Sequence, residues 1–142
     1  MLMYEVHHQG NPYKGEPPRA WVRLCFIGID GSPNELDLVA DTGSPFPVVV
    51  STALMRKLKH HDTNTVQTNF GLLEGAWVHV QAPELELDDL IEGHASDKVV
   101  ESVSANHPDF AGLVGLPLLR MLDYGGNANE FWIRPQLSKP KS

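Results

Sequence analysis

The sequence predicts a single, mostly β domain with two short helices. Three observations favour this fold class. Apolar runs rich in β-branched and aromatic residues have strand length and are separated by dense turn signals. Only two stretches have helical character, and both are short. The chain has 142 residues, of which 42% are hydrophobic, enough for one globular domain with a modest core.

Charge and cysteine content narrow the function classes. Eleven Lys and Arg face 18 Asp and Glu, giving a formal net charge of −7 with no basic cluster, so we expect no nucleic-acid or membrane partner. The single Cys25 lies in an apolar run and is interpreted as a small buried hydrophobe. Met1–Glu5 lacks the features of a signal peptide, and no apolar run has the length of a membrane span. We therefore expect a cytoplasmic protein.

The first third of the chain is predicted to form a β-hairpin. Residues 1–19 are polar and rich in Gly and Pro, which indicates an irregular arm before a domain spanning 20–135. Ala20–Ile27 has strand composition, Gly28–Asn34 is a turn, and Glu35–Ala40 is a second strand that leads to Asp41.

A short strand and a helix follow. Val48–Val50 is predicted to be a buried strand. Ser51 is a suitable N-cap for a helix over Thr52–Lys59, in which Leu54 and Leu58 share a face.

A second hairpin is predicted between residues 65 and 80. Its strands are Thr65–Phe70 and Ala76–Val80, and Gly71–Gly75 forms the tip. Leu72 and Leu73 at an exposed tip are unfavourable unless they cover something, so the tip is either a flap over a site or packed on the core.

The last third contains strands and one helix. Acidic Glu84–Ile91 is interpreted as a half-solvated strand and turn closed by Gly93, and Lys98–Val103 as a further strand. After a turn at 106–109 and an apolar run, Pro117 suits the first turn of a helix that Gly125 and Gly126 end. Residues 129–134 are a terminal strand, and 136–142 a polar tail.

Asp41 is the candidate functional residue. It stands at a turn between two apolar segments, where an ionised carboxylate needs partners. The turn offers the Thr42 hydroxyl, the Gly43 backbone N–H and the Ser44 hydroxyl.

Two motifs carry a family resemblance. Leu-Val-Ala-Asp-Thr-Gly-Ser at residues 38–44 resembles the active-site loop of aspartic proteases, and Leu113-Val114-Gly115 resembles the apolar pair and Gly that follow downstream in that family. Because the chain is long enough for one lobe only, it is most similar to the single-lobed, retropepsin-like group. The resemblance implies a closed β-barrel and a homodimer in which each chain contributes one Asp41 to a water-activating carboxylate pair.

The resemblance also implies roles for individual residues. Asp41 would be catalytic, Thr42 would brace the two loops, and Gly43 would dock substrate backbone. Ser44 would hydrogen-bond the carboxylate, and Val114 would line the pocket floor. The residues implied to lie over the substrate are Phe70, Gly71 and Leu72. The expected activity is hydrolysis of an extended peptide within a peptide or protein substrate, without a cofactor.

The chain departs from the family at two positions. Retroviral members usually have an acidic residue two positions after the tripeptide's Gly, and an Arg directly after the later Gly, and these two residues pair. Here the positions hold Pro45 and Leu116. Because both halves of the ion pair are missing, neither leaves an unpaired buried charge.

The sequence gives little support for other kinds of site. The adjacent pairs His7-His8 and His60-His61 do not project together, so no metal site is expected. Ser44 and Ser51 lack a nucleophile-elbow context. The other Asp residues are expected on the solvated surface. The alternative function is a protease-like fold kept as a peptide-binding or dimerisation module, which would grip a partner through the hairpin 65–80 and the strand 129–134.

Overall fold

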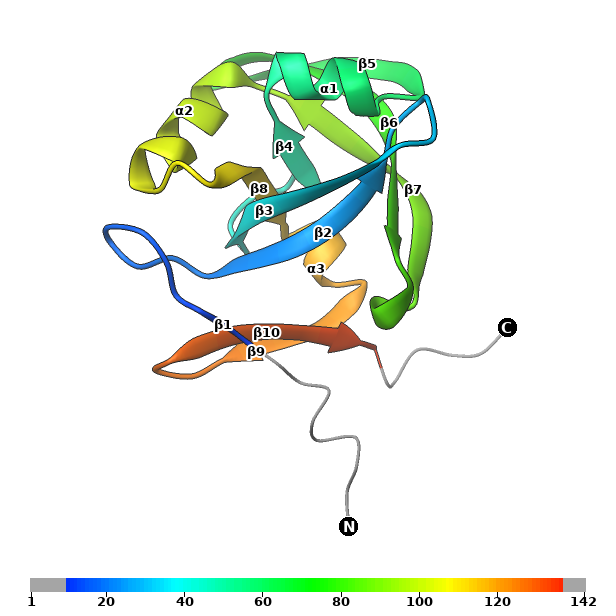
Figure 1. The fold of residues 1–142 in the computed structure, drawn as a ribbon. Coiled ribbons are helices and arrows are strands. Elements are labelled where there is room, and N and C mark those ends of the chain that lie inside the picture. The colour runs from blue at the N-terminus through cyan, green and yellow to red at the C-terminus, as the bar shows by residue number, and fades with distance from the viewer. Residues whose placement is uncertain (1–9, 137–142) are drawn as a thin grey trace.

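The computed structural model describes residues 10–136, which form a β-barrel with helices around it and a small sheet below (Figure 1). The arm predicted for 1–19 is therefore described from residue 10 on, where it holds a two-residue strand and a turn. Met1–Glu5 and the tail beyond Gln136 lie outside the described residues.

The strands in chain order are β1 (Asn11–Pro12), β2 (Trp21–Ile27), β3 (Pro33–Asp41), β4 (Val48–Val50), β5 (His61–Thr68), β6 (Gly71–Ala82), β7 (Leu87–Ala95), β8 (Phe110–Gly115), β9 (Leu122–Gly126) and β10 (Glu130–Pro135). The helices are α1 (Thr52–Leu58), α2 (Asp97–Asn106), α3 (Leu116–Leu119) and the 3₁₀ helix η2 (Pro83–Leu85). The mostly β prediction is confirmed, with three short α-helices where the sequence predicted two.

The barrel closes through six strands in the order β2-β3-β8-β4-β7-β6, because β6 also pairs with β2. Strand β5 adds to the free side of β6. Strand β8 lies between β3 and β4, parallel to the first and antiparallel to the second. The chain from β3 to β4 therefore crosses the end of β8, and Asp41 lies at that crossing.

The first hairpin is confirmed. Strands β2 and β3 pair antiparallel, with Trp21 opposite Val39. Val22, Leu24 and Phe26 point into the barrel, and alternation turns Cys25 outward, where it is half-exposed. The prediction that Cys25 is buried was therefore wrong.

Helix α1 is confirmed, whereas the prediction of a strand at Lys98–Val103 was wrong. In α1 the Ser51 hydroxyl accepts a hydrogen bond from Leu54 N at 3.1 Å. The predicted strand is part of helix α2, whose N-cap Ser96 accepts a hydrogen bond from Val99 N. A good N-cap and the face formed by Val99 and Val103 outweigh the β propensity of the valines.

The second hairpin turns earlier than predicted. The turn lies at Asn69–Phe70, and Gly71 follows with a φ of 94°, a conformation that favours glycine. The shift places Leu72 and Leu73 on a strand, so alternation exposes Leu72 and buries Leu73. Gly93 was predicted to close the following strand, but it lies inside β7.

The C-terminal helix is much shorter than predicted. It ends at Leu119, and Leu122–Gly126 form strand β9, which pairs antiparallel with the confirmed terminal strand β10. Gly125 does not stop a helix, because it pairs with Trp132, and a Cβ there would lie 2.6 Å from the Trp132 ring. The small sheet β1-β10-β9 covers the lower end of the barrel (Figure 1).

The core has two parts. The barrel interior holds the larger cluster, which includes Leu24, Phe26, Leu38 and Val114. A smaller cluster lies outside the barrel wall, where α2 packs on β8 and β4; its members are Trp21, Val39, Val49, Val103, Phe110 and Leu113. No helix within residues 10–136 is long and apolar enough to cross a membrane.

Candidate active site

Asp41 is the last residue of β3, and its backbone pairs with Gly115 at the end of β8. The two motifs identified in the sequence are therefore neighbours in space, although residues 45–112 lie between them along the chain. Their meeting follows from the insertion of β8 between β3 and β4.

The backbone of the loop holds the Asp41 carboxylate. Gly43 N donates a hydrogen bond to Asp41 Oδ1 at 2.9 Å, and Ser44 N donates to the Asp41 carbonyl oxygen at 3.1 Å. Asp41 is half-buried, whereas Thr42 and Gly43 are exposed. The carboxylate is thus oriented by its own turn and remains accessible to a ligand.

Ser44 contacts a different partner from the one expected. Its hydroxyl accepts a hydrogen bond from Phe46 N at 3.1 Å and donates one to the Phe46 carbonyl oxygen at 3.2 Å. Ser44 is 9% exposed. Its side chain therefore fixes the path of the loop and the position of Phe46, and its described hydrogen bonds do not reach the carboxylate of Asp41.

Gly115 allows β8 to approach the loop closely. A Cβ on Gly115 would overlap the carbonyl oxygen of Phe46 and lie 2.7 Å from that of Ser44. Two hydrogen bonds close the same junction: Gly115 N donates to the Pro47 carbonyl oxygen at 2.9 Å, and Leu116 N donates to that of Ser44 at 3.1 Å. Position 115 therefore has room for glycine only, unless β8 or the loop shifts.

Asp41 lines a pocket of about 250 Å³. The pocket lies between the Asp41 loop, one side of α2 and the turn of the β5–β6 hairpin, which contributes Phe70. Of the site residues predicted from the sequence, the pocket brings together Asp41, Gly43, Ser44 and Phe70. Phe70 is 56% exposed, so it forms a rim and is not part of the core.

Four predicted site residues do not line this pocket: Thr42, Gly71, Leu72 and Val114. Val114 is 0% exposed and points into the barrel, while its neighbour Leu113 lines the pocket, because successive side chains on a strand face opposite sides. Leu72 lines an adjacent hollow with Thr65 and Lys98, and Phe70 borders both cavities. The last predicted flap residue, Gly71, lies directly after Phe70 in the turn.

Sequence reasoning missed much of the pocket wall. One side comes from α2, through Val99, Ser102 and Val103, whose i, i+3, i+4 spacing would have indicated one face of a helix. The other residues that were missed are Arg19, Pro45, Phe46, Val49, Leu73 and Leu113.

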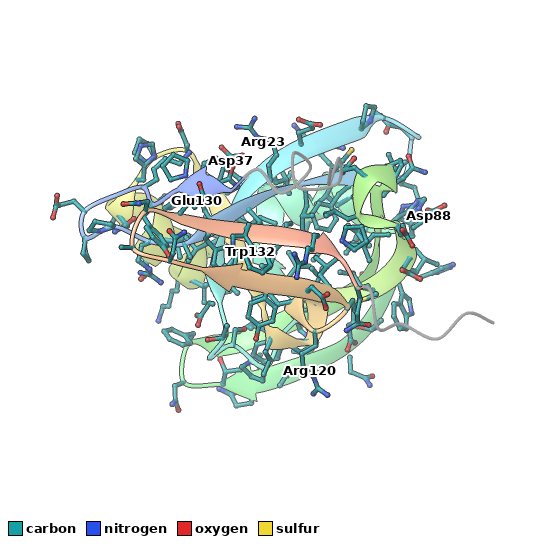
Figure 2. All side chains as sticks on the ribbon, turned by 90° about the horizontal axis from the view of Figure 1, so that it is seen from below. Arg23, Asp37, Asp88, Arg120, Glu130 and Trp132 are labelled. Carbon is teal, nitrogen blue, oxygen red and sulfur yellow. The ribbon has the colours of Figure 1, made fainter. Side chains whose placement is uncertain are left out.

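The loop has a second, outward side. Thr42, Pro45, Leu116, Pro117 and Arg120 line a shallow hollow there, beyond the pocket that contains Asp41. Figure 2, seen from below, labels Arg120 at the side of the molecule opposite Arg23 and Asp37. Pro45 and Leu116, the two positions that the resemblance relates to the retroviral ion pair, both line this hollow and are uncharged.

Asp37, outside the pocket, forms ion pairs with Arg23 and Lys14. Burial alone would raise the pKa of Asp37, but hydrogen bonds and the charge of Arg23, with the charge of Lys14, outweigh it and hold the pKa below its ordinary value. Arg23 Nε lies 2.7 Å from Asp37 Oδ1, and Figure 2 shows the two residues side by side. Asp37 has a side-chain exposure of 13%, so the expectation of a solvated surface position was wrong for it.

His94 packs beneath the loop. Its ring centroid lies 4.6 Å from that of Phe46, and its Nδ1 has no hydrogen-bond partner among the described residues. The residue is 2% exposed, and burial lowers the pKa of His94. Within residues 10–136, no group of three or more His, Cys, Asp or Glu side chains could hold a metal ion.

Asp41 is the only carboxylate among the residues that line its pocket within the described part of the chain. Arg19 is the only Lys or Arg there, and the remaining side chains are mostly apolar. Such a pocket suits an apolar side chain of a ligand, which would then lie beside the carboxylate of Asp41. Comparison with family models, with curated proteins and with solved structures finds no match for this chain.

Proposed function

We propose that this chain is an aspartic endopeptidase that works as a homodimer. The observation that carries the proposal is the Asp41 carboxylate, oriented by Gly43 N–H, accessible, and set in a mainly apolar pocket rimmed by a hairpin turn. The Asp-Thr-Gly-Ser sequence of the loop and its contact with Gly115 agree with the resemblance to single-lobed aspartic proteases.

The proposed chemistry needs a second carboxylate. Two Asp41 side chains facing each other across a two-fold axis would share one proton, because like charges so close cannot both ionise easily. The ionised carboxylate takes a proton from a bound water, which attacks the peptide carbonyl carbon. The protonated carboxylate donates its proton to the carbonyl oxygen, which gives a tetrahedral intermediate. The C–N bond then breaks: the nitrogen leaves as an amine with the proton that the other carboxylate took from the water, and one hydroxyl of the intermediate returns its proton to the pair.

The outward side of the loop is the proposed contact between the two copies. Thr42 and Gly43 are exposed there, and Pro45, Leu116 and Pro117 give the hollow an apolar character. In the proposed dimer Thr42 braces the opposite loop, and the Gly43 backbone docks the substrate chain. Phe70, on the rim of the pocket, lies over the bound peptide.

The test combines mass, cleavage and binding. Light scattering on a size-exclusion column should give about twice the chain mass of 15.7 kDa at micromolar concentration. A peptide library should be cleaved best at acidic pH, as expected of a shared proton. Asp41→Asn should abolish cleavage and leave peptide binding largely intact. Asp62→Asn, at a side chain 75% exposed, is the matched control and should cleave like the parent.

Three results would count against the proposal: a monomer at every concentration, cleavage that survives Asp41→Asn, or a flat activity profile from about pH 4 to 8. Peptide binding without any cleavage would support the alternative, a binding module. That module was expected to use the hairpin 65–80 and the strand 129–134. The latter, β10, is already paired with β9 from Phe131 to Pro135 and with β1 at Glu130 and Phe131. The edge of β5 would be the more open one, since its described pairing is with β6 alone.

A further inference from the structure

Arg19 lines the same pocket as Asp41. It lies just before β2, in a turn closed by two backbone hydrogen bonds with Lys14: Arg19 N donates to the Lys14 carbonyl oxygen at 2.8 Å, and Lys14 N donates to that of Arg19 at 3.1 Å. Arg19 is half-buried. Its backbone is therefore fixed, and the residue is part of the pocket wall.

The other cations nearby are engaged. Lys14 lies 3.4 Å from an Asp37 carboxylate oxygen and 3.7 Å from one of Asp109, and Arg23 pairs with Asp37. For Arg19, by contrast, the described residues supply no ion pair and no side-chain hydrogen bond. A half-buried arginine in a mainly apolar pocket gains from a carboxylate acceptor, to which its guanidinium can donate two parallel hydrogen bonds.

We propose that Arg19 is a specificity-determining residue that binds a carboxylate of the peptide, from an acidic side chain or from the C-terminus. This inference rests on the proposed function for the nature of the ligand. The formal net charge of −7 repels an acidic peptide from the molecule as a whole, so such a preference has to come from a local cation. An apolar side chain fills the pocket, and the carboxylate lies on Arg19.

Arg19 has one competing role, because Asp41 lines the same pocket and could itself be the partner of the guanidinium. The two roles differ in a measurable way. A residue that pairs with Asp41 affects all peptides alike and alters the pH profile of kcat. A residue that binds a ligand carboxylate affects the KM or Kd of acidic peptides and leaves neutral ones nearly unchanged.

The experiment measures binding and cleavage of matched peptides. The probes are decapeptides with a central Phe-Leu pair, in which each other position in turn holds Glu or its neutral isostere Gln, with the C-terminus free or amidated. The proteins are the full chain, Asp41→Asn, Arg19→Gln, Arg19→Lys and the control Arg56→Gln on the exposed surface of α1. For the measurement of Kd by fluorescence anisotropy, each Arg variant is combined with Asp41→Asn so that no peptide is cleaved. Peptide cleavage by the same variants with Asp41 intact gives kcat and KM.

The parent should prefer Glu over Gln at one position, or the free C-terminus over the amide, by about tenfold, as expected for a charge-assisted hydrogen bond. Arg19→Gln should remove the preference, Arg19→Lys should keep part of it, and Arg56→Gln should keep all of it. If Arg19→Gln fails to fold, the preference in the parent should still fall as salt rises from about 0.05 to about 0.5 M.

The outcomes separate this inference from the proposed function. Binding with an Arg19-dependent preference but without cleavage supports the role of Arg19 and overturns the peptidase. Cleavage without any preference for a carboxylate, or with one that survives Arg19→Gln and rising salt, overturns the role of Arg19 alone. If no peptide binds to the parent or to Asp41→Asn, both proposals fail.

Discussion

Gly115→Ala tests the junction on which the candidate site depends. The added Cβ would overlap the Phe46 carbonyl oxygen, and it would lie 2.7 Å from the Ser44 carbonyl oxygen and 2.9 Å from Ser44 Cβ. Two of these three contacts are with backbone atoms, which cannot move away by changing a rotamer. Either β8 or the Asp41 loop must shift, and with it the hydrogen bond from Leu116 N to Ser44.

The magnitude follows from two opposing effects. Overpacking a tight junction costs about 1 to 3 kcal/mol, and backbone contacts place this case near the upper value. Replacing Gly by Ala returns about 0.4 to 1 kcal/mol, because it restricts the unfolded chain. The net loss is about 2 kcal/mol, and in a chain of this length it lowers Tm by roughly 6 to 8 °C.

The assay is thermal unfolding followed by circular dichroism, with the fold of each variant checked at low temperature. Gly31→Ala is the matched control. A Cβ at Gly31 meets nothing within 4 Å, so its cost is limited to the φ of 85°, about 1 kcal/mol, which the same entropic gain partly offsets. A Tm for Gly115→Ala within about 2 °C of the parent would contradict the close approach of β8 to the loop.

Three further predictions concern charge and the pocket rim. Because the pKa of Asp37 is lower in the folded chain than in the unfolded chain, its pairing with Arg23 stabilises the fold above a pH of about 3.9. Urea unfolding should therefore show that the difference in free energy of unfolding between the parent and Asp37→Asn shrinks as the pH falls towards about 2. A difference that stays constant would refute the pairing. Burial lowers the pKa of His94, so the unfolded chain binds more protons than the folded chain just below a pH of about 6.5. The free energy of unfolding therefore decreases as the pH is lowered through that range. His94→Leu should flatten that slope, and an unchanged slope would assign it to another group. Phe70 borders the Asp41 pocket whereas Leu72 does not, and both side chains are exposed. Phe70→Ala should therefore weaken peptide binding by about tenfold and Leu72→Ala by much less, and neither should change Tm much. Equal effects on binding would contradict the position of Phe70 at the rim.

The sequence predicted those parts of the fold whose signals are local. The β2–β3 hairpin, the short strand β4 and the capped helix α1 are each specified by residues within a few positions of one another. Asp41 at the end of the hairpin could be identified for the same reason. The contact between Asp41 and Gly115 is long-range, and only the resemblance to a family brought the two segments together.

Errors arose where local preferences were close to balanced. Val99 and Val100 favour a strand by composition, and the cap at Ser96 together with packing on the barrel wall decides for a helix. In the β5–β6 hairpin, moving the turn by a few residues decides whether Leu73 faces solvent or the interior. The wall of the pocket depends on both outcomes, so most of its residues could not be found from the sequence.

The pocket is formed by one chain alone, whereas the chemistry proposed for the Asp41 loop needs a second copy of the chain. Asp41, Arg19 and Phe70 enclose a pocket within one chain, so binding of an apolar side chain needs no partner. The chemistry proposed for Asp41 needs a second carboxylate, and the pocket wall contributes no other within the described residues. In the proposed dimer, the surface towards the second copy is the side of the loop with Pro45 and Leu116, and both of these positions are uncharged. An interface without that ion pair depends on buried apolar area, since exposed ion pairs contribute little and weaken with salt. Dimerisation, and not the pocket, is therefore the step on which the peptidase proposal depends most.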